Sequence, residues 1–125
     1  MTLAAGLDIG TQGVKLLVLD PVLRRVVAAA GQPLELLAGA DGSREQHPQW
    51  WIAAATACFA MLDPEVRRGI RAIGVSGQQH GFVPLDASGA VLAPAKLWCD
   101  TSTQQECGEI MAAAGGADRC IELAG

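Results

Sequence analysis

The sequence predicts an α/β fold whose sheet starts with three antiparallel strands and continues, after a helix, with parallel strands. Three short apolar runs lie within the first 31 residues, and turn signals separate them. A long alanine-rich stretch follows at 49–63, with apolar residues at helical spacing, and another short apolar run comes at 70–77. Because a strand that follows a helix usually lies parallel to a member of the same sheet, we expect one mixed sheet.

The first three strands are expected at 3–9, 14–20 and 24–31. The connections between them are too short to hold a crossover helix, so neighbouring strands in this part must be antiparallel. Pro48 suits the first turn of the helix, and the Asp63-Pro64 pair ends or kinks it.

The remaining chain predicts shorter elements. We expect a polar loop at 38–48, a strand of buried character at 70–77, a hairpin within 81–98 that turns at 86–89, and a second helix at 103–115.

Composition excludes several classes of protein. Half of the 125 residues are hydrophobic, which is ample for a core, so the chain is not disordered. The net charge of -4 argues against a nucleic-acid partner bound by a basic face. There is no apolar run of about 18 residues and no basic segment before an apolar one at the start, so we expect no membrane span and a cytoplasmic protein.

The cysteines do not form a metal-binding pattern. No C-x-x-C pair occurs, and we expect free thiols at Cys58, Cys99, Cys107 and Cys120.

A turn between the first two strands is the strongest candidate site. Asp8 ends one strand, the Gly10–Gly13 turn follows, and Lys15 lies in the next strand. Glycines let main-chain N–H groups converge on a phosphate, and a carboxylate is a hard ligand for Mg²⁺. A plain hairpin with a solvated Asp and Lys stays open as the alternative. The candidate phosphate-binding residues are Gly10, Thr11, Gln12, Gly13 and Lys15, and Asp8 is the candidate for catalysis and for Mg²⁺, directly or through water.

Two further segments offer groups that suit a sugar. Gln79 and His80 each donate and accept hydrogen bonds, as a polyol requires, although a tight turn explains them equally. Trp98 offers an apolar face and Asp100 a hydroxyl acceptor. Alternatively, Trp98 anchors the core and Asp100 caps the next helix. We expect the Gly10–Gly13 turn and the Gln–His pair to face each other across one crevice.

Taken in order, four motifs resemble the N-terminal part of the FGGY carbohydrate kinases, and within them most closely the xylulokinases. LDIGTQGVKLLVLD resembles the first phosphate motif of the family, and EQHPQWW the stretch that opens the family's first helix. GVSGQQHG and PAKLWCDTST resemble its G-x-x-G-Q-x-H-G and P-x-x-L-W-x-D segments.

The resemblance implies a ribonuclease-H-like fold of the actin/hexokinase/Hsp70 superfamily. It also implies ATP-dependent phosphorylation of a ketose, D-xylulose to D-xylulose 5-phosphate, with ATP and Mg²⁺. By this resemblance Asp8 assists the Mg-ATP side, and the residues that hold the sugar are Gln79, His80, Trp98 and Asp100. Glycerol kinases carry Arg-Glu at the Gln79-His80 positions, which argues against glycerol. The expected partners are a small-molecule sugar and ATP, with a homodimer of the longer enzyme as one assembly.

The chain departs from the family in two respects. Ser102 stands where many members carry Arg, so a cation beside Asp100 is missing. Family members are also several times longer, so we expect residues 1–125 to be part of the N-terminal kinase domain. The C-terminal actin-like domain, the general base and the adenosine pocket are then absent from this chain, and the 125 residues alone are expected to be inactive.

Other functions stay open at this stage. One is phosphorylation of ribulose, gluconate, fuculose or another polyol. A second is a non-catalytic nucleotide-binding module of the actin/Hsp70 type, and a third is a structural domain with degenerate sites.

Overall fold

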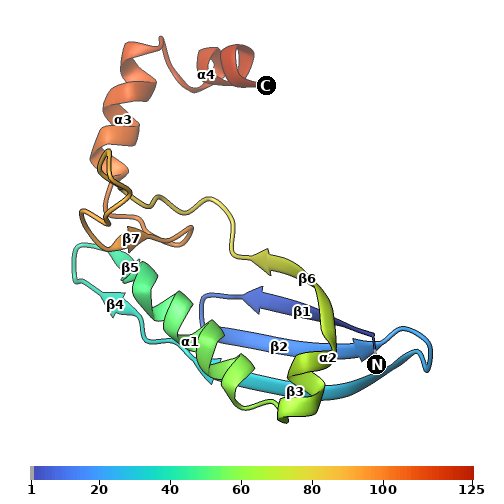
Figure 1. Cartoon of the computed structure of the whole chain (residues 1–125). Helices are drawn as coiled ribbons and strands as arrows, with labels where there is room; N and C mark the ends of the chain where they lie inside the picture. Colours follow the sequence, from blue (N-terminus) through green and yellow to red (C-terminus); the bar gives the residue numbers. More distant parts are fainter. Residues whose placement is uncertain (1) are drawn as a thin grey trace.

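The computed structural model describes residues 2–125, and its centre is a four-stranded sheet with the strand order β3-β2-β1-β6 (Figure 1). The strands are β1 (Leu3–Ile9), β2 (Gly13–Asp20), β3 (Arg25–Pro33) and β6 (Ile70–Gly77). β1 is antiparallel to β2 and β2 to β3, whereas β6 lies parallel to β1. The mixed sheet expected from the sequence is confirmed.

The helix α1 (Pro48–Ala60) covers one face of this sheet. Along β2, Leu16 is fully buried beneath the helix while Leu17 on the other face is 51% exposed. Such alternation is the pattern of a strand with one covered face. From the helix side, Ala54 and Cys58 enter the same core.

The helical region differs from expectation at its end. α1 stops at Ala60, and a second short helix, α2 (Pro64–Gly69), follows it. The Asp63 carboxylate accepts a hydrogen bond from the N–H of Glu65, so this residue caps α2 rather than closing α1.

The expected loop at 38–48 instead contains two short strands. β4 (Leu37–Ala38) and β5 (Arg44–Gln46) form a small second sheet with β7 (Ala95–Lys96). The partner strand lies about fifty positions further along, so the local pattern gave no sign of this pairing. The turn at Asp86 forms as expected, but only isolated bridges flank it.

The expectation of a buried strand at 70–77 is wrong. Within β6, Ile73 is 54% and Val75 is 65% exposed. The reason is that α1 packs mainly over β2 and β3, so it leaves most of β6 uncovered at the edge of the sheet.

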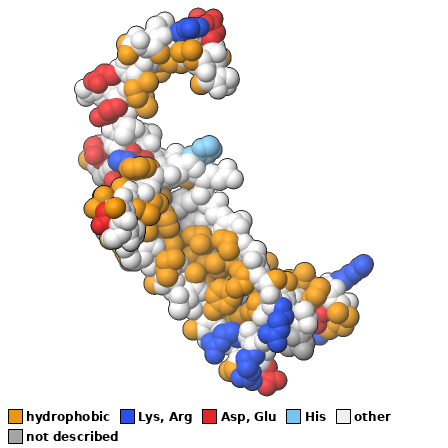
Figure 2. Space-filling view, turned by 45° about the horizontal axis from the view of Figure 1, so that its top comes forward, with side chains coloured by type: hydrophobic (Ala, Val, Ile, Leu, Met, Phe, Trp, Pro, Cys, Tyr) orange, Lys and Arg blue, Asp and Glu red, His pale blue; other side chains and the backbone are white. Residues whose placement is uncertain are grey.

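The C-terminal part forms two helices that extend away from the sheet (Figure 1). α3 (Gln104–Ala113) matches the helix expected at 103–115, and α4 (Ala117–Ala124) was not expected. Hydrophobic side chains gather over the middle of the sheet body and again along this extension (Figure 2). Over residues 2–125, no helix has the length and apolar character that crossing a membrane requires.

Candidate functional site

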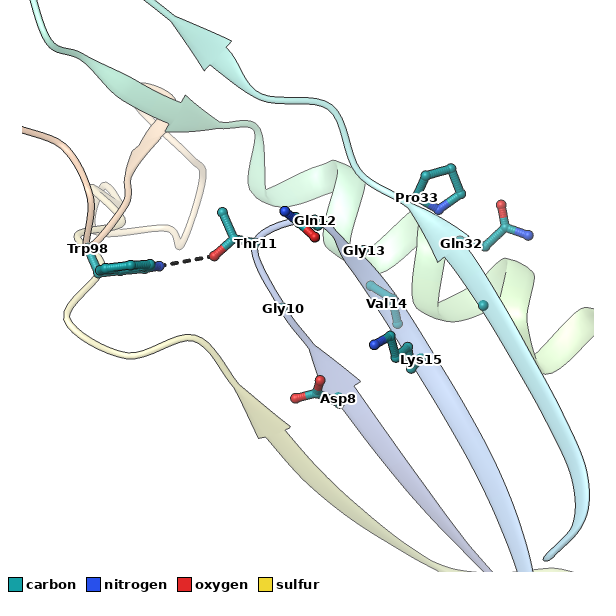
Figure 3. A pocket seen from close by; sticks show the side chains of 11 residues that line it. Asp8, Gly10, Thr11, Gln12, Gly13, Val14, Lys15, Gln32, Pro33 and Trp98 are labelled. Atoms are coloured by element: carbon teal, nitrogen blue, oxygen red, sulfur yellow. Dashed lines mark hydrogen bonds between the residues drawn. The ribbon is translucent and has the colours of Figure 1, made fainter.

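The Gly10–Gly13 turn opens into a cavity of about 650 Å³, called here the turn cavity (Figure 3). Every candidate on the phosphate side lines it, and so do Trp98 and residues 31–33 of β3. Its lining residues are Asp8, Gly10, Thr11, Gln12, Gly13, Val14, Lys15, Gly31, Gln32, Pro33 and Trp98.

The sheet places a carboxylate and an ammonium group next to each other in this cavity. Asp8 and Lys15 are direct partners across the β1–β2 pair, and both point away from α1. Ser76 is the partner of Asp8 on β6, and its hydroxyl donates to Asp8 Oδ1 over 2.7 Å. The carboxylate is therefore held in place from the neighbouring strand.

The structure requires glycine in this turn for a different reason from the one expected. Neither Gly10 nor Gly13 has a positive φ, so no left-handed conformation is required there. A Cβ on Gly13 would lie 2.6 Å from the carbonyl oxygen of Gln32, so only glycine allows β2 to approach β3 this closely. The Gly10 N–H donates to the Gly13 carbonyl over 3.0 Å, so this N–H is used within the turn and does not face a ligand.

His80 lines a second cavity of about 400 Å³, called here the His80 cavity. Trp51, Gln78 and apolar residues of β6 and the 81–97 segment form its walls. Gln79 is exposed and does not line it, so the glutamine that the structure brings to this cavity is Gln78. His80 has a φ of 57°, a left-handed conformation that is uncommon outside glycine.

In this structure the Gly10–Gly13 turn and His80 line two separate cavities and not one crevice. The cavities are adjacent, since the hydroxyl of Thr11 from the first donates to Gln78 Oε1 from the second over 3.0 Å. The Gln78 N–H also donates to the Ile9 carbonyl over 3.0 Å. The two cavities are thus neighbours joined by this contact.

Trp98 belongs to the turn cavity. Its side chain is 61% exposed, so the alternative of a core anchor is wrong. Its indole N–H donates to the Thr11 hydroxyl over 3.0 Å, as Figure 3 shows. The ring therefore borders the turn cavity rather than the His80 cavity.

The Asp100 carboxylate lines neither cavity and is occupied by protein partners. Oδ1 accepts from the N–H and hydroxyl of Ser102, and Oδ2 accepts from the Arg44 N–H and from Lys96 Nζ. The hydroxyl of Ser102 and the Arg44 N–H hold the pKa of Asp100 well below its usual range. Thr103, not Asp100, is the N-cap of α3, so the capping alternative is wrong.

Lys96 supplies the cation that was expected to be missing beside Asp100. Its Nζ lies 3.3 Å from Asp100 Oδ2 and 3.4 Å from Glu45 Oε1. Ser102 still contributes, because its hydroxyl accepts from the same Nζ over 2.8 Å.

Sequence reasoning missed three polar residues of this region, namely Gln46, Ser76 and Gln78. Gln46 stands in the EQHP segment that was assigned only to the start of the helix, and Gln78 stands beside the chosen Gln79. Ser76 would have been recognised as the partner of Asp8 if the register of β6 against β1 had been known.

The four cysteines are free thiols, as expected. Among residues 2–125, no group of three His, Cys, Asp or Glu side chains is placed to hold a metal ion by itself.

Residues 3–125 match the FGGY family of carbohydrate kinases, N-terminal domain. A xylulose kinase of Haemophilus influenzae is 38% identical over 127 residues, covering 96% of this chain and 26% of that protein. This chain thus spans about a quarter of the length of that relative.

Solved structures give the same result. The crystal structure of a xyloylose kinase from Brucella ovis matches with a TM-score of 0.81 and 38% identity, over 89% of this chain and 24% of that one. The structure of a xylulose kinase from Rhodospirillum rubrum matches with a TM-score of 0.78 and 31% identity, over 89% and 23%.

Proposed function

The chain belongs to the FGGY family of carbohydrate kinases, and we propose that it supplies the phosphate-side half of a kinase that converts D-xylulose to D-xylulose 5-phosphate. The observation that carries this proposal is the turn cavity, in which Asp8 and Lys15 stand beside the Gly10–Gly13 turn. The 38% identity to a xylulose kinase supports xylulose as the sugar.

Phosphoryl transfer depends on positioning the reacting groups and on offsetting negative charge. In this proposal the Lys15 ammonium offsets charge on the ATP phosphates. The main-chain N–H groups of the turn beyond Gly10 orient the phosphate oxygens. The turn cavity, at about 650 Å³, has room for such a group.

Asp8 fits a role toward Mg²⁺. Its carboxylate is exposed to the turn cavity, and Mg²⁺ in kinases keeps several waters while using one or two carboxylates and the substrate phosphates. When bound, the ion neutralises charge on the phosphates. The Ser76 hydroxyl would keep Asp8 oriented for that contact.

The proposed sugar-binding site depends mainly on His80. Its imidazole lies at the wall of the His80 cavity and can both donate to and accept from sugar hydroxyls. Gln78 contributes an amide to the same cavity, while Gln79 and Trp98 remain proposed sugar contacts from outside its wall. Asp100 is proposed to act on the sugar only through the Trp98 segment that it holds, because its oxygens are already occupied.

A sugar screen on the protein as the cell makes it tests this function. We expect ATP-dependent phosphorylation of D-xylulose in preference to ribulose, gluconate, fuculose and glycerol. His80→Ala should raise the KM for xylulose about tenfold, the value of one or two hydrogen bonds. His47→Ala is the matched control, because His47 lines neither cavity.

Two results would reject the proposal. Absence of phosphorylation of every sugar would remove the kinase function, and an unchanged KM in His80→Ala would remove His80 from the sugar site. We also propose that residues 1–125 alone do not turn over ATP with xylulose. Among residues 2–125, Asp8 is the one carboxylate that lines the turn cavity, and the general base that the family requires would come from elsewhere.

Localisation in the cytoplasm is part of the same proposal. It follows from the expected substrates, ATP and a phosphorylatable sugar, and from the four free thiols.

A further inference from the structure

Gln46 is fully buried, and its amide makes every hydrogen bond that an amide can make. Nε2 donates to the carbonyl oxygens of Thr11 over 2.8 Å and Glu35 over 2.7 Å. Oε1 accepts from the Trp51 indole over 2.9 Å and from Gln78 Nε2 over 3.2 Å. Two donors and two lone pairs are thus all used. One side chain joins the turn, the segment after β3, the start of α1 and the segment after β6.

This arrangement decides which end of Gln78 faces Thr11. Because Gln78 Nε2 donates to Gln46, the Oε1 atom of Gln78 faces Thr11 and accepts a hydrogen bond from the Thr11 hydroxyl. The oxygen of that hydroxyl then accepts from the Trp98 indole. The orientation of Gln46 is therefore passed through Gln78 and Thr11 to Trp98, with which Gln46 itself makes no hydrogen bond.

Gln46 lines neither the turn cavity nor the His80 cavity. It holds one residue of each, since Thr11 lines the first and Gln78 the second. Hydrogen bonds in a buried network strengthen one another, and a partner lost from such a network leaves polar groups unpaired. A change at Gln46 should therefore affect both cavities at once.

We propose that Gln46 is a positioning residue that fixes the phosphate turn relative to Gln78 and so couples the turn cavity to the His80 cavity. The kinetic consequence of this inference rests on the proposed kinase function. Its structural consequence rests on the hydrogen-bond network alone. The two consequences are measured separately.

Gln46→Glu is the test variant. It keeps the shape of the side chain but removes both N–H donors, so the carbonyls of Thr11 and Glu35 lose their partner. Gln49→Glu is the matched control, with the same chemical change on an exposed position of α1. Both variants are made in the protein as the cell produces it, and circular dichroism checks that each is folded.

The kinetic readout is the coupling between the two substrates. We expect Gln46→Glu to lower kcat about tenfold to about a hundredfold, as small misplacements at reacting groups do. The ratio of ATP-analogue affinities with and without D-xylulose should also move toward one. A merely structural role would lower the melting temperature and leave this ratio unchanged, as Gln49→Glu should leave it.

The structural readout needs no activity. The indole N–H signal of Trp98 in a nitrogen–proton correlation spectrum should shift in Gln46→Glu and stay in place in Gln49→Glu. A folded Gln46→Glu protein with an unmoved Trp98 signal and an unchanged coupling ratio overturns the proposal. If the wild-type protein phosphorylates no sugar, the kinase function fails, and the Trp98 signal still decides whether Gln46 positions the turn.

A second variant covers the case in which Gln46→Glu does not fold. Trp51→Phe keeps an aromatic ring but removes the indole donor to Gln46 Oε1. The Trp98 signal should then shift in the same direction by a smaller amount, and an unmoved signal overturns the proposal.

Discussion

The indole N–H of Trp98 donates to the hydroxyl of Thr11 over 3.0 Å, and the two residues stand 87 positions apart in the sequence. The contact joins the segment after β7 to the turn between β1 and β2. It places an aromatic ring beside the Gly10–Gly13 turn, whereas the sequence had assigned Trp98 to the sugar. The Thr11 hydroxyl is consequently shared between Trp98 and Gln78.

Removing this hydroxyl should loosen the turn. Thr11→Val keeps the branched shape but leaves the Trp98 N–H and Gln78 Oε1 without their partner. We expect a loss of about 1 to 2 kcal/mol in the free energy of unfolding, because two hydrogen bonds of about 1 kcal/mol or less each are removed. Thr11→Ser keeps the hydroxyl and should stay near wild type. Equal losses in both variants, measured by denaturant unfolding, would show that the methyl group and not the hydroxyl matters.

Asp100 should make stability depend on pH in the acid range. Hydrogen bonds from the Ser102 hydroxyl and the Arg44 N–H lower the pKa of this carboxyl in the folded protein. An unfolded Asp has a pKa of about 3.9, so below about pH 4 the unfolded chain binds the proton more readily. The stabilisation by Asp100 is therefore complete above about pH 5 and is lost as the pH falls toward the lowered pKa.

Thermal unfolding from pH 7 to pH 3 measures this effect. Asp100→Asn should melt below wild type at pH 7, and the gap should narrow below about pH 4. Asp118→Asn is the control, because Asp118 is exposed on α4. A gap that stays constant down to pH 3 would mean that the charge of Asp100 does not stabilise the fold.

The main sheet was predictable because its signals are local. Apolar runs of strand length and short connections determine an antiparallel meander, and an alanine-rich stretch after Pro48 determines a helix. The second sheet was not predictable, since β5 pairs with Ala95 and Lys96 far along the chain. The exposure of Val75 was missed because a buried and an edge strand can have the same apolar sequence.

The grouping of Asp8 and Lys15 at one turn was predictable for the same reason. Asp8 and Lys15 flank one short turn, so any hairpin places them close together. The arrangement around Gln46 was not, because a buried amide shows no pattern in the sequence and depends on partners up to 35 positions away.

The two faces of β2 should respond differently to truncation. Leu16 is fully buried beneath α1, whereas Leu17 is 51% exposed on the opposite face. Leu16→Ala should lower the free energy of unfolding by about 3 kcal/mol, because it leaves a cavity in the core. Leu17→Ala should cost less than about 1 kcal/mol. Similar losses in urea titrations of the 125-residue chain would show that both faces are covered.

The strained backbone at His80 allows its shape and its imidazole to be tested separately. With a φ of 57°, position 80 suits glycine better than any residue that carries a Cβ. His80→Gly should therefore be more stable than His80→Ala by about 1 kcal/mol. If the imidazole binds the sugar, both variants raise the KM for xylulose equally despite this difference in stability. A KM that follows stability, with the glycine variant near wild type, would mean that the backbone at position 80 matters and that the imidazole does not touch the sugar.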